Sequence, residues 1–374
     1  MAEVPRGVCM ICAVQLWEWS PDHDQSPNPY KWREAHVLLS GPTWPCDEKG
    51  PQSMTIPDTS VTIRNARVFD HGRATLATGL SVSLQLENLP EQHQNHDPAN
   101  GHRWYLAIHS ACEAMARGAM RAPCSKIRTM GDLWMTIDRR CVKTADDDNL
   151  LPLYLPKVPE NRPGEPIELG LGRYYIPRSA ICSTEPVLND PSHEWWNYDP
   201  LNIPHMTEAL LSNLERHEAS STTCQQFTNR FNSLPREIKD VITSHLGRGS
   251  TSLKCTYLIP QSCWKEVLFR IPFLWDIEKD LVETKNQEAL LRAFEWNWEK
   301  LVRQIMSEVS IVRIDDEIDP EVTTLWSYQK VGLTVQPSLT NRRRIWQILA
   351  DMYPNDVGMV HFMGDEDVVV DKDY

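Results

Sequence analysis

Residues 231–246 read Phe-Asn-Ser-Leu-Pro-Arg-Glu-Ile-Lys-Asp-Val-Ile-Thr-Ser-His-Leu, and this stretch predicts a short amphipathic helix. Pro235 suits the first turn of a helix, where the missing N–H of proline costs nothing. Glu237 lies in the same turn, where the helix dipole favours a negative charge, and Gly247 follows as a helix-ending residue. At helical spacing, one apolar stripe is formed by Leu234, Ile238, Val241, Ile242 and Leu246.

The rest of the C-terminal half also carries apolar residues at helical spacing. We expect helices over residues 205–217, 287–309 and 341–353, with Asn341 as the N-cap of the last one. The segment before them differs, because ten of the 27 prolines in the chain lie within residues 151–204. Each proline fixes φ and removes a backbone donor, so this segment predicts an extended wrap or linker.

The N-terminal part mixes strand and helix patterns. Leu80, Val82, Leu84 and Leu86 alternate with polar residues, which is typical of a half-buried strand. Turn residues at 70–73 lie between this strand and the strand expected over residues 60–69, and they predict that the two strands form a hairpin. The expected elements are strands over 60–69, 80–86 and 104–108 and helices over 110–119 and 129–141.

Together these patterns predict an α+β protein with a small sheet in its N-terminal domain and a helical C-terminal part. The expected parts are a mixed N-terminal domain (1–150), a proline-rich wrap or linker (151–204), a helical region (205–360) with a short helical module at about 231–275, and an acidic tail (361–374).

The 231–246 stretch resembles the opening of an F-box, through its Leu-Pro-Arg-Glu-Ile followed by Ile and Leu. Three further segments are similar to segments of fungal F-box-like proteins and occur in the same order. They are the Ile-Pro-Gln-Ser-Cys-Trp-Lys of residues 259–265, the Leu-Thr-Asn-Arg-Arg-Arg-Ile-Trp of residues 339–346, and the His-Ser-Ala-Cys of residues 109–112. The four segments are spread over roughly residues 105–350.

This resemblance implies an F-box-like substrate receptor. In such a protein the F-box binds a Skp-type adaptor and, through it, the cullin scaffold of a ubiquitin ligase, while the remaining chain holds a client protein. The receptor itself is not an enzyme and requires no cofactor. Carried onto this chain, the adaptor-binding residues are Leu234, Pro235, Ile238, Val241 and Ile242.

Two other functions stay open at this point. Only residues 247–258 separate the first helix of the F-box-like module from its Pro-Gln-Ser-x-Trp segment, so the chain could be an interaction protein whose shortened module no longer binds an adaptor. Asp315, Asp316 and Asp319 resemble the Asp-Asp-x-x-Asp magnesium motif of terpene synthases, which would indicate a magnesium-dependent enzyme. Because Pro320 follows directly, the alternative interpretation is an acidic turn.

Four residues predict a metal site. Cys9 and Cys12, together with His109 and Cys112, offer three thiolates and one imidazole, a donor set that suits tetrahedral zinc. Four protein ligands leave no open position, so such a zinc would be structural. The alternatives are buried core thiols with an ordinary histidine at a helix start, or a site in which Cys46 is a ligand.

Composition limits the partners and the compartment. The 38 basic residues against 51 acidic ones give a net charge of −13, which repels phosphate backbones and anionic lipid and argues against nucleic acid and membrane partners. No apolar stretch approaches the ~18–20 residues that span a bilayer. Ten scattered cysteines and the lack of an Asn-x-Ser/Thr sequon favour a cytoplasmic or nuclear location.

Overall fold

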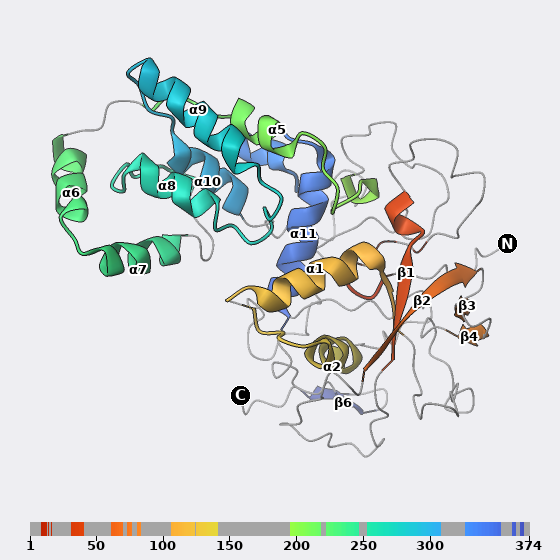
Figure 1. The fold of residues 1–374 in the computed structure, drawn as a ribbon. Coiled ribbons are helices and arrows are strands. Elements are labelled where there is room, and N and C mark those ends of the chain that lie inside the picture. The colour runs from red at the N-terminus through yellow and green to blue at the C-terminus, as the bar shows by residue number, and fades with distance from the viewer. Residues whose placement is uncertain are drawn as a thin grey trace. The chain divides into compact units, whose positions relative to one another are not determined.

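The structure of the chain is a computed structural model. It describes residues 9–12, 14, 16, 31–40, 61–69, 73–76, 81–83, 106–123, 125–140, 195–217, 222–246, 253–307, 326–352, 361–363 and 367–369 (Figure 1). The chain is a mixed α and β protein, and none of the described helices is long and apolar enough to cross a membrane.

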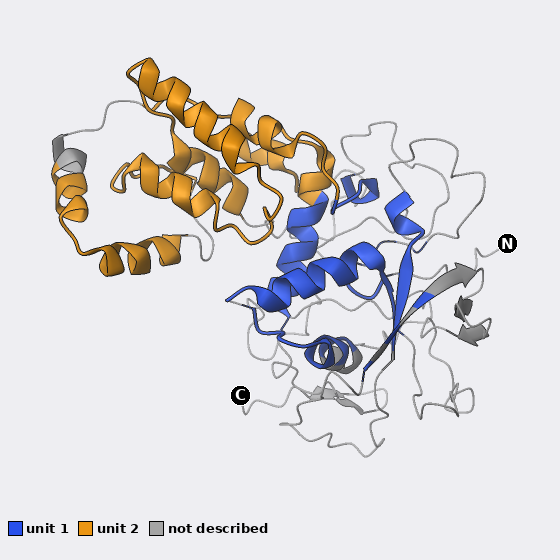
Figure 2. Cartoon of the chain, viewed as in Figure 1, with its two compact units in different colours: residues 1–201, 311–323, 341–374 blue, residues 202–310, 324–340 orange. Residues whose placement is uncertain are grey.

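The chain divides into two compact units. Unit 1 comprises residues 1–201, 311–323 and 341–374, and unit 2 comprises residues 202–310 and 324–340 (Figure 2). These boundaries differ from the domain boundaries predicted from the sequence. Unit 1 is not continuous in sequence, because the chain leaves it after residue 201 and returns to it at residues 311–323 and 341–374. Of the expected proline-rich wrap, residues 151–194 lie outside the described residues.

Unit 1 contains an antiparallel sheet of five strands in the order β4-β3-β2-β1-β5. The strands are β1 (His36–Ser40), β2 (Thr62–Phe69), β3 (Arg73–Leu76), β4 (Ser81–Ser83) and β5 (Leu106–His109). The sequence predicted β2, β5 and part of β4. It missed β3, so the expected hairpin of the first two strands is wrong: β3 lies between β2 and β4 and pairs with both.

Strand β1 was missed because its sequence does not alternate. Val37, Leu38 and Leu39 are all buried, as happens in a strand that is covered on both faces. β1 pairs with β5 so that His36 lies opposite His109. This register places the end of β5 beside the start of β1.

The helices of unit 1 follow the predicted ones closely. α1 (Ser110–Arg121) continues directly from β5, and α2 (Met130–Arg140) follows it. A short hairpin of β6 (His361–Met363) and β7 (Asp367–Val369) occupies part of the expected acidic tail.

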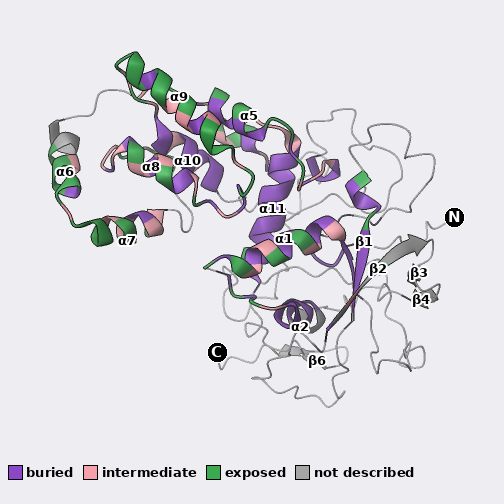
Figure 3. Ribbon diagram, in the orientation of Figure 1, coloured by how far each residue is buried: buried purple, intermediate pink, exposed green. Residues whose placement is uncertain are grey.

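Helix α11 (Pro337–Asp351) begins four residues earlier than predicted, with proline in its first turn. Asn341 is therefore not the N-cap but a buried residue inside the helix. All residues from 341 to 349 are buried (Figure 3). A Cβ atom on Gly118 of α1 would lie 3.5 Å from the Trp346 ring, so the two helices are closely packed there.

Unit 2 is helical. Its elements are α5 (Met206–Ser212), α6 (Thr222–Asn232), α7 (Arg236–Leu246), α8 (Gln261–Leu268), α9 (Lys279–Leu291), α10 (Trp298–Met306) and a 3-10 helix (Tyr328–Val331). α8 and α10 lie side by side, and their shared core contains the buried side chains of Trp264, Leu268, Trp298, Leu301 and Ile305.

The single helix predicted over 287–309 is wrong, because the chain breaks it into the end of α9 and α10. Ala293 takes a positive φ of 55°, a conformation that interrupts a helix. Asn297 then caps α10 by accepting a hydrogen bond from the Lys300 N–H (3.0 Å). Apolar spacing continues across this break, so the pattern alone did not reveal it.

Candidate functional site

The four residues of the predicted metal site come together in unit 1. Cys9, Cys12, His109 and Cys112 are all buried, and one ligand atom from each lies within 4.8 Å of the others. The Cys12 Sγ atom is 3.4 Å from His109 Nδ1. A tetrahedral zinc ion would separate a sulfur and a nitrogen ligand by about 3.6 Å and two sulfurs by about 3.8 Å. The four residues are therefore grouped closely enough that a metal ion could bind among them.

Cys9 and Cys12 lie on a tight turn at residues 9–12. The Cys9 N–H donates to the Val14 carbonyl (2.9 Å), which closes the turn, and the Met10 N–H donates to the Ala107 carbonyl of β5 (3.0 Å). These bonds attach the turn to the strand that carries the third ligand.

The other two ligands lie where β5 becomes α1. His109 is the last residue of β5 and the N-cap of α1, and Cys112 lies in the first turn of that helix. The partial positive charge of a helix N-terminus favours a thiolate at this place. The His109 N–H also donates to the Cys9 Sγ atom (3.4 Å), so both halves of the site are hydrogen-bonded to each other.

The three thiols differ in acidity. Burial raises the pKa of the Cys12 and Cys112 thiols well above the ordinary value. Burial alone would also raise the pKa of Cys9, but hydrogen bonds from Cys112 and Cys12 and the neighbouring His109 lower it well below that value. The Cys9 thiol is thus more acidic than the Cys12 and Cys112 thiols.

Aromatic rings lie against the imidazole of His109. The Trp32 ring centroid lies 4.6 Å away, and the His36 ring centroid lies 5.8 Å away. Burial, with the charge of His109 as the second cause, lowers the pKa of His36 to about 3, so His36 is neutral at physiological pH. Its Nε2 lies 2.6 Å from the Arg33 carbonyl, to which a neutral ring can donate.

Arg344 of α11 reaches the same site from the C-terminal part of unit 1. Its guanidinium is buried and donates from Nη2 to the Cys12 carbonyl (2.6 Å). Its Cζ atom lies 5.5 Å from the centroid of the Trp195 ring. Burial lowers the pKa of Arg344 to about 10, with the three cysteines acting in the opposite direction, so the side chain stays positively charged at neutral pH.

The residues before Arg344 fix a neighbouring segment of main chain. The Asn341 side chain donates from Nδ2 to the Tyr198 carbonyl (2.9 Å). Arg342 donates from Nε to the Pro200 carbonyl (2.6 Å) and from Nη2 to the Leu201 carbonyl (2.7 Å). The Asn-Arg-Arg-Arg segment, which offered no mechanism from sequence, thus holds residues 195–201 and contacts the metal site.

The five residues expected to bind an adaptor lie on α7 and immediately before it, in unit 2. Ile238 and Val241 are 47% and 55% exposed, and Pro235 is also exposed. Leu234 and Ile242 are partly buried. Figure 3 shows that most of α7 is exposed or intermediate. The apolar stripe of this helix is therefore only partly covered within the chain.

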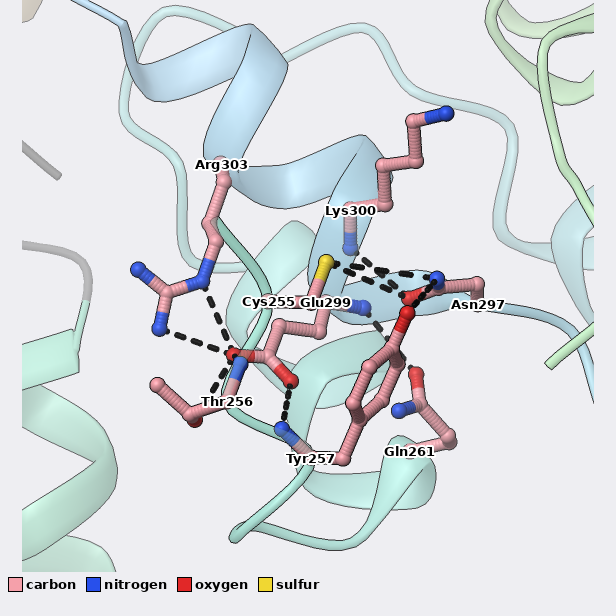
Figure 4. A network of polar contacts seen from close by, with 8 residues as sticks. All are labelled: Cys255, Thr256, Tyr257, Gln261, Asn297, Glu299, Lys300 and Arg303. Carbon is pink, nitrogen blue, oxygen red and sulfur yellow. Dashed lines mark hydrogen bonds and ion pairs between the residues drawn. The ribbon is translucent and has the colours of Figure 1, made fainter. Parts of the chain in front are cut away.

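A polar network around Glu299 was not predicted (Figure 4). The Glu299 carboxylate is buried, and it accepts hydrogen bonds from the main-chain N–H groups of Thr256 and Tyr257 (both 2.8 Å) and from the Thr256 hydroxyl (2.9 Å). Arg303 adds a charge-assisted hydrogen bond from Nε (2.9 Å). Tyr257 takes a positive φ of 56°, and the carboxylate holds the chain in this strained turn.

The same network connects α8 to α10. The Gln261 side chain accepts a hydrogen bond from the Glu299 N–H (3.0 Å), and the Asn297 side chain donates to the Tyr257 hydroxyl (3.3 Å). These bonds fasten Thr256 and Tyr257, which lie in the connection between α7 and α8, to the core of unit 2. The network therefore has a structural role, because it joins the turn before α8 to α10.

Two sequence hypotheses fall outside the described residues. These are the acidic cluster at residues 315–319 and the alternative ligand Cys46.

Comparison of the chain with protein-family models, with curated proteins and with solved structures gives no significant match.

Proposed function

We propose that the chain is a non-catalytic, F-box-like substrate receptor that binds a Skp-type adaptor through α7 and thereby joins a cullin-based ubiquitin ligase. The observation that supports this most is the exposure of the apolar stripe on α7, where Ile238 and Val241 are about half exposed. A helix whose only task was to support its own core would bury these two positions.

The apolar stripe would contribute part of the energy of an interface. Fully burying one exposed apolar side chain contributes about 1.5–3 kcal/mol before the costs of ordering and desolvation. Because Ile238 and Val241 are only about half exposed, covering them and Pro235 would supply part of this energy, with Leu234 and Ile242 forming the base of the contact.

Co-purification with the Skp-type adaptor at physiological salt tests this proposal. We expect the unaltered chain to form a stable complex and the pair Ile238→Glu/Val241→Glu to lose it, because each change places a charge in an apolar contact. The loss in thermal stability should be small, since about half of each side chain is already exposed to solvent. Leu234→Ala/Pro235→Ala should weaken the complex in the same way.

Leu291→Glu is the matched control. Leu291 is an apolar residue of α9 that is 87% exposed, so the same kind of change there should leave adaptor binding intact. If the folded chain forms no complex, the shortened module is a remnant, and the chain is an interaction protein of another kind. Loss of folding in the α7 variants would instead mean that the stripe belongs to the core of unit 2.

We further propose that Cys9, Cys12, His109 and Cys112 hold a structural zinc ion. Three thiolates and one imidazole are the donor set of structural zinc sites, and one ligand atom from each residue lies within 4.8 Å of the others. Their complete burial leaves no room for a reacting water or substrate, which favours a structural role. Zinc bound there would join the turn at residues 9–12 to the β5–α1 junction.

Elemental analysis tests the zinc proposal directly. Zinc-replete protein should contain about one equivalent of zinc, and the pair Cys9→Ser/Cys12→Ser should remove it. The control pair is Cys255→Ser/Cys263→Ser, which changes two half-buried cysteines of unit 2 and should leave the zinc content unchanged. Freshly purified protein without zinc, in a buffer free of chelators, would refute the proposal.

A further inference from the structure

A zinc ion with three thiolates and one neutral imidazole carries a net charge of −1. The proposed ligands are all buried, and an uncompensated charge in a protein interior is costly. The site therefore needs a buried positive charge nearby, in addition to the metal.

Arg344 supplies a charge at this place. Its side chain is 1% exposed, and its guanidinium donates to the carbonyl of Cys12, a residue of the ligand set itself. Arg344 is thus a buried cationic side chain that is hydrogen-bonded to the turn that carries two of the four residues.

We propose that Arg344 is a positioning residue of the metal centre: it balances the negative charge of the zinc–thiolate group and fixes the turn at residues 9–12 through the Cys12 carbonyl. This inference rests on the proposed zinc site. If Arg344 has this role, zinc binding stabilises the packing of α11 in unit 1, and the packing of α11 in turn stabilises zinc binding.

Arg342 provides a comparison within the same helix. It is equally buried, but its hydrogen bonds described above go to the carbonyls of Pro200 and Leu201 and not to the ligand turn. Replacing Arg342 by methionine removes a buried guanidinium without removing the contact to Cys12. Comparing variants at Arg344 and Arg342 therefore distinguishes a general loss of packing from a specific effect on zinc affinity.

The test measures zinc affinity by competition with a chromophoric chelator for the full chain and for Arg344→Met, Arg344→Lys and Arg342→Met. We expect Arg344→Met to bind zinc about 10- to 100-fold more weakly, the usual cost of losing a residue that supports metal ligands. Arg344→Lys keeps the positive charge and should recover part of this affinity. Arg342→Met should bind zinc like the unaltered chain, although its stability falls.

The absorption spectrum of the cobalt(II)-substituted protein gives a second readout. The tetrahedral thiolate spectrum should be the same in Arg344→Met as in the unaltered chain, because the four ligands remain. A changed ligand set in that variant would contradict the proposed role.

The outcomes distinguish the two proposals. If the unaltered chain binds no zinc, the zinc site fails and this inference fails with it. If the unaltered chain binds zinc and Arg344→Met binds it equally well, or Arg342→Met loses as much affinity, the zinc site stands and the role of Arg344 is overturned. Should Arg344→Met not fold, Arg344→Lys decides: a loss of zinc affinity as large as the 10- to 100-fold loss expected for Arg344→Met would refute charge balance.

Discussion

Removal of the proposed zinc ion should unfold the core of unit 1. The turn at residues 9–12 is attached to β5 and α11 next to the four proposed ligand residues, so without zinc the buried thiols and the imidazole lose the ion that would join the turn to the β5–α1 junction. Structural zinc contributes about 10–16 kcal/mol of apparent free energy in zinc-finger peptides at neutral pH. This is an upper limit here, because apolar side chains such as Leu38 and Ile108 are buried in the same core.

Hydrogen exchange with and without a chelator measures the effect at peptide resolution. Amides of residues 106–121 and 341–352 should lose protection when zinc is removed, and Cys12→Ser should give the same pattern without a chelator. Cys255→Ser serves as the control and should retain full protection in both segments. Unchanged protection of α1 and α11 in metal-free protein would contradict a structural role for the ion.

The second large effect is expected at Glu299. Glu299→Gln should lower the free energy of unfolding of unit 2 by about 3–5 kcal/mol, the usual cost of breaking a buried charge pair from one side. Glutamine keeps the volume of glutamate but carries no charge and offers a single acceptor oxygen. It cannot accept from the Thr256 and Tyr257 N–H groups, the Thr256 hydroxyl and Arg303 together. Urea unfolding followed by circular dichroism measures the loss.

Glu283→Gln is the matched change for Glu299→Gln. Glu283 pairs with Lys265 at 2.7 Å, but its side chain is 46% exposed, so this substitution should cost less than about 1 kcal/mol. Equal losses in the two variants would mean that the Glu299 network does not support Thr256 and Tyr257 as the structure indicates.

The features that could be predicted from sequence were those with a local pattern. The 3.6-residue period gave α7, the Ala-rich run gave α1, and the Cys-x-x-Cys and His-x-x-Cys spacings gave both halves of the metal site. Each of these signals lies within one short continuous segment of the chain. The assembly of the two halves, about 100 residues apart, followed only from the chemistry that zinc requires.

The features that were missed depend on distant partners. Nothing near Glu299 shows that its carboxylate accepts hydrogen bonds from residues more than 40 positions earlier, and nothing near Arg344 shows that it reaches Cys12. Apolar residues on both sides of residues 292–297 keep the helical period, so the break before α10 is invisible to a pattern search. Strand β1 was hidden for the opposite reason, since it has no alternation at all.

The return of the chain to unit 1 has a consequence for synthesis on the ribosome. Cys112 completes the ligand set, but Arg344 is translated about 230 residues later, which takes tens of seconds at a rate of about 5–20 residues per second. During this interval the thiols exist without α11, so a nascent chain could bind zinc early but could not yet bury it beneath this helix. Interrupted synthesis would then leave an open thiol cluster, and folding in the cell would depend on how long that cluster stays reduced and protected.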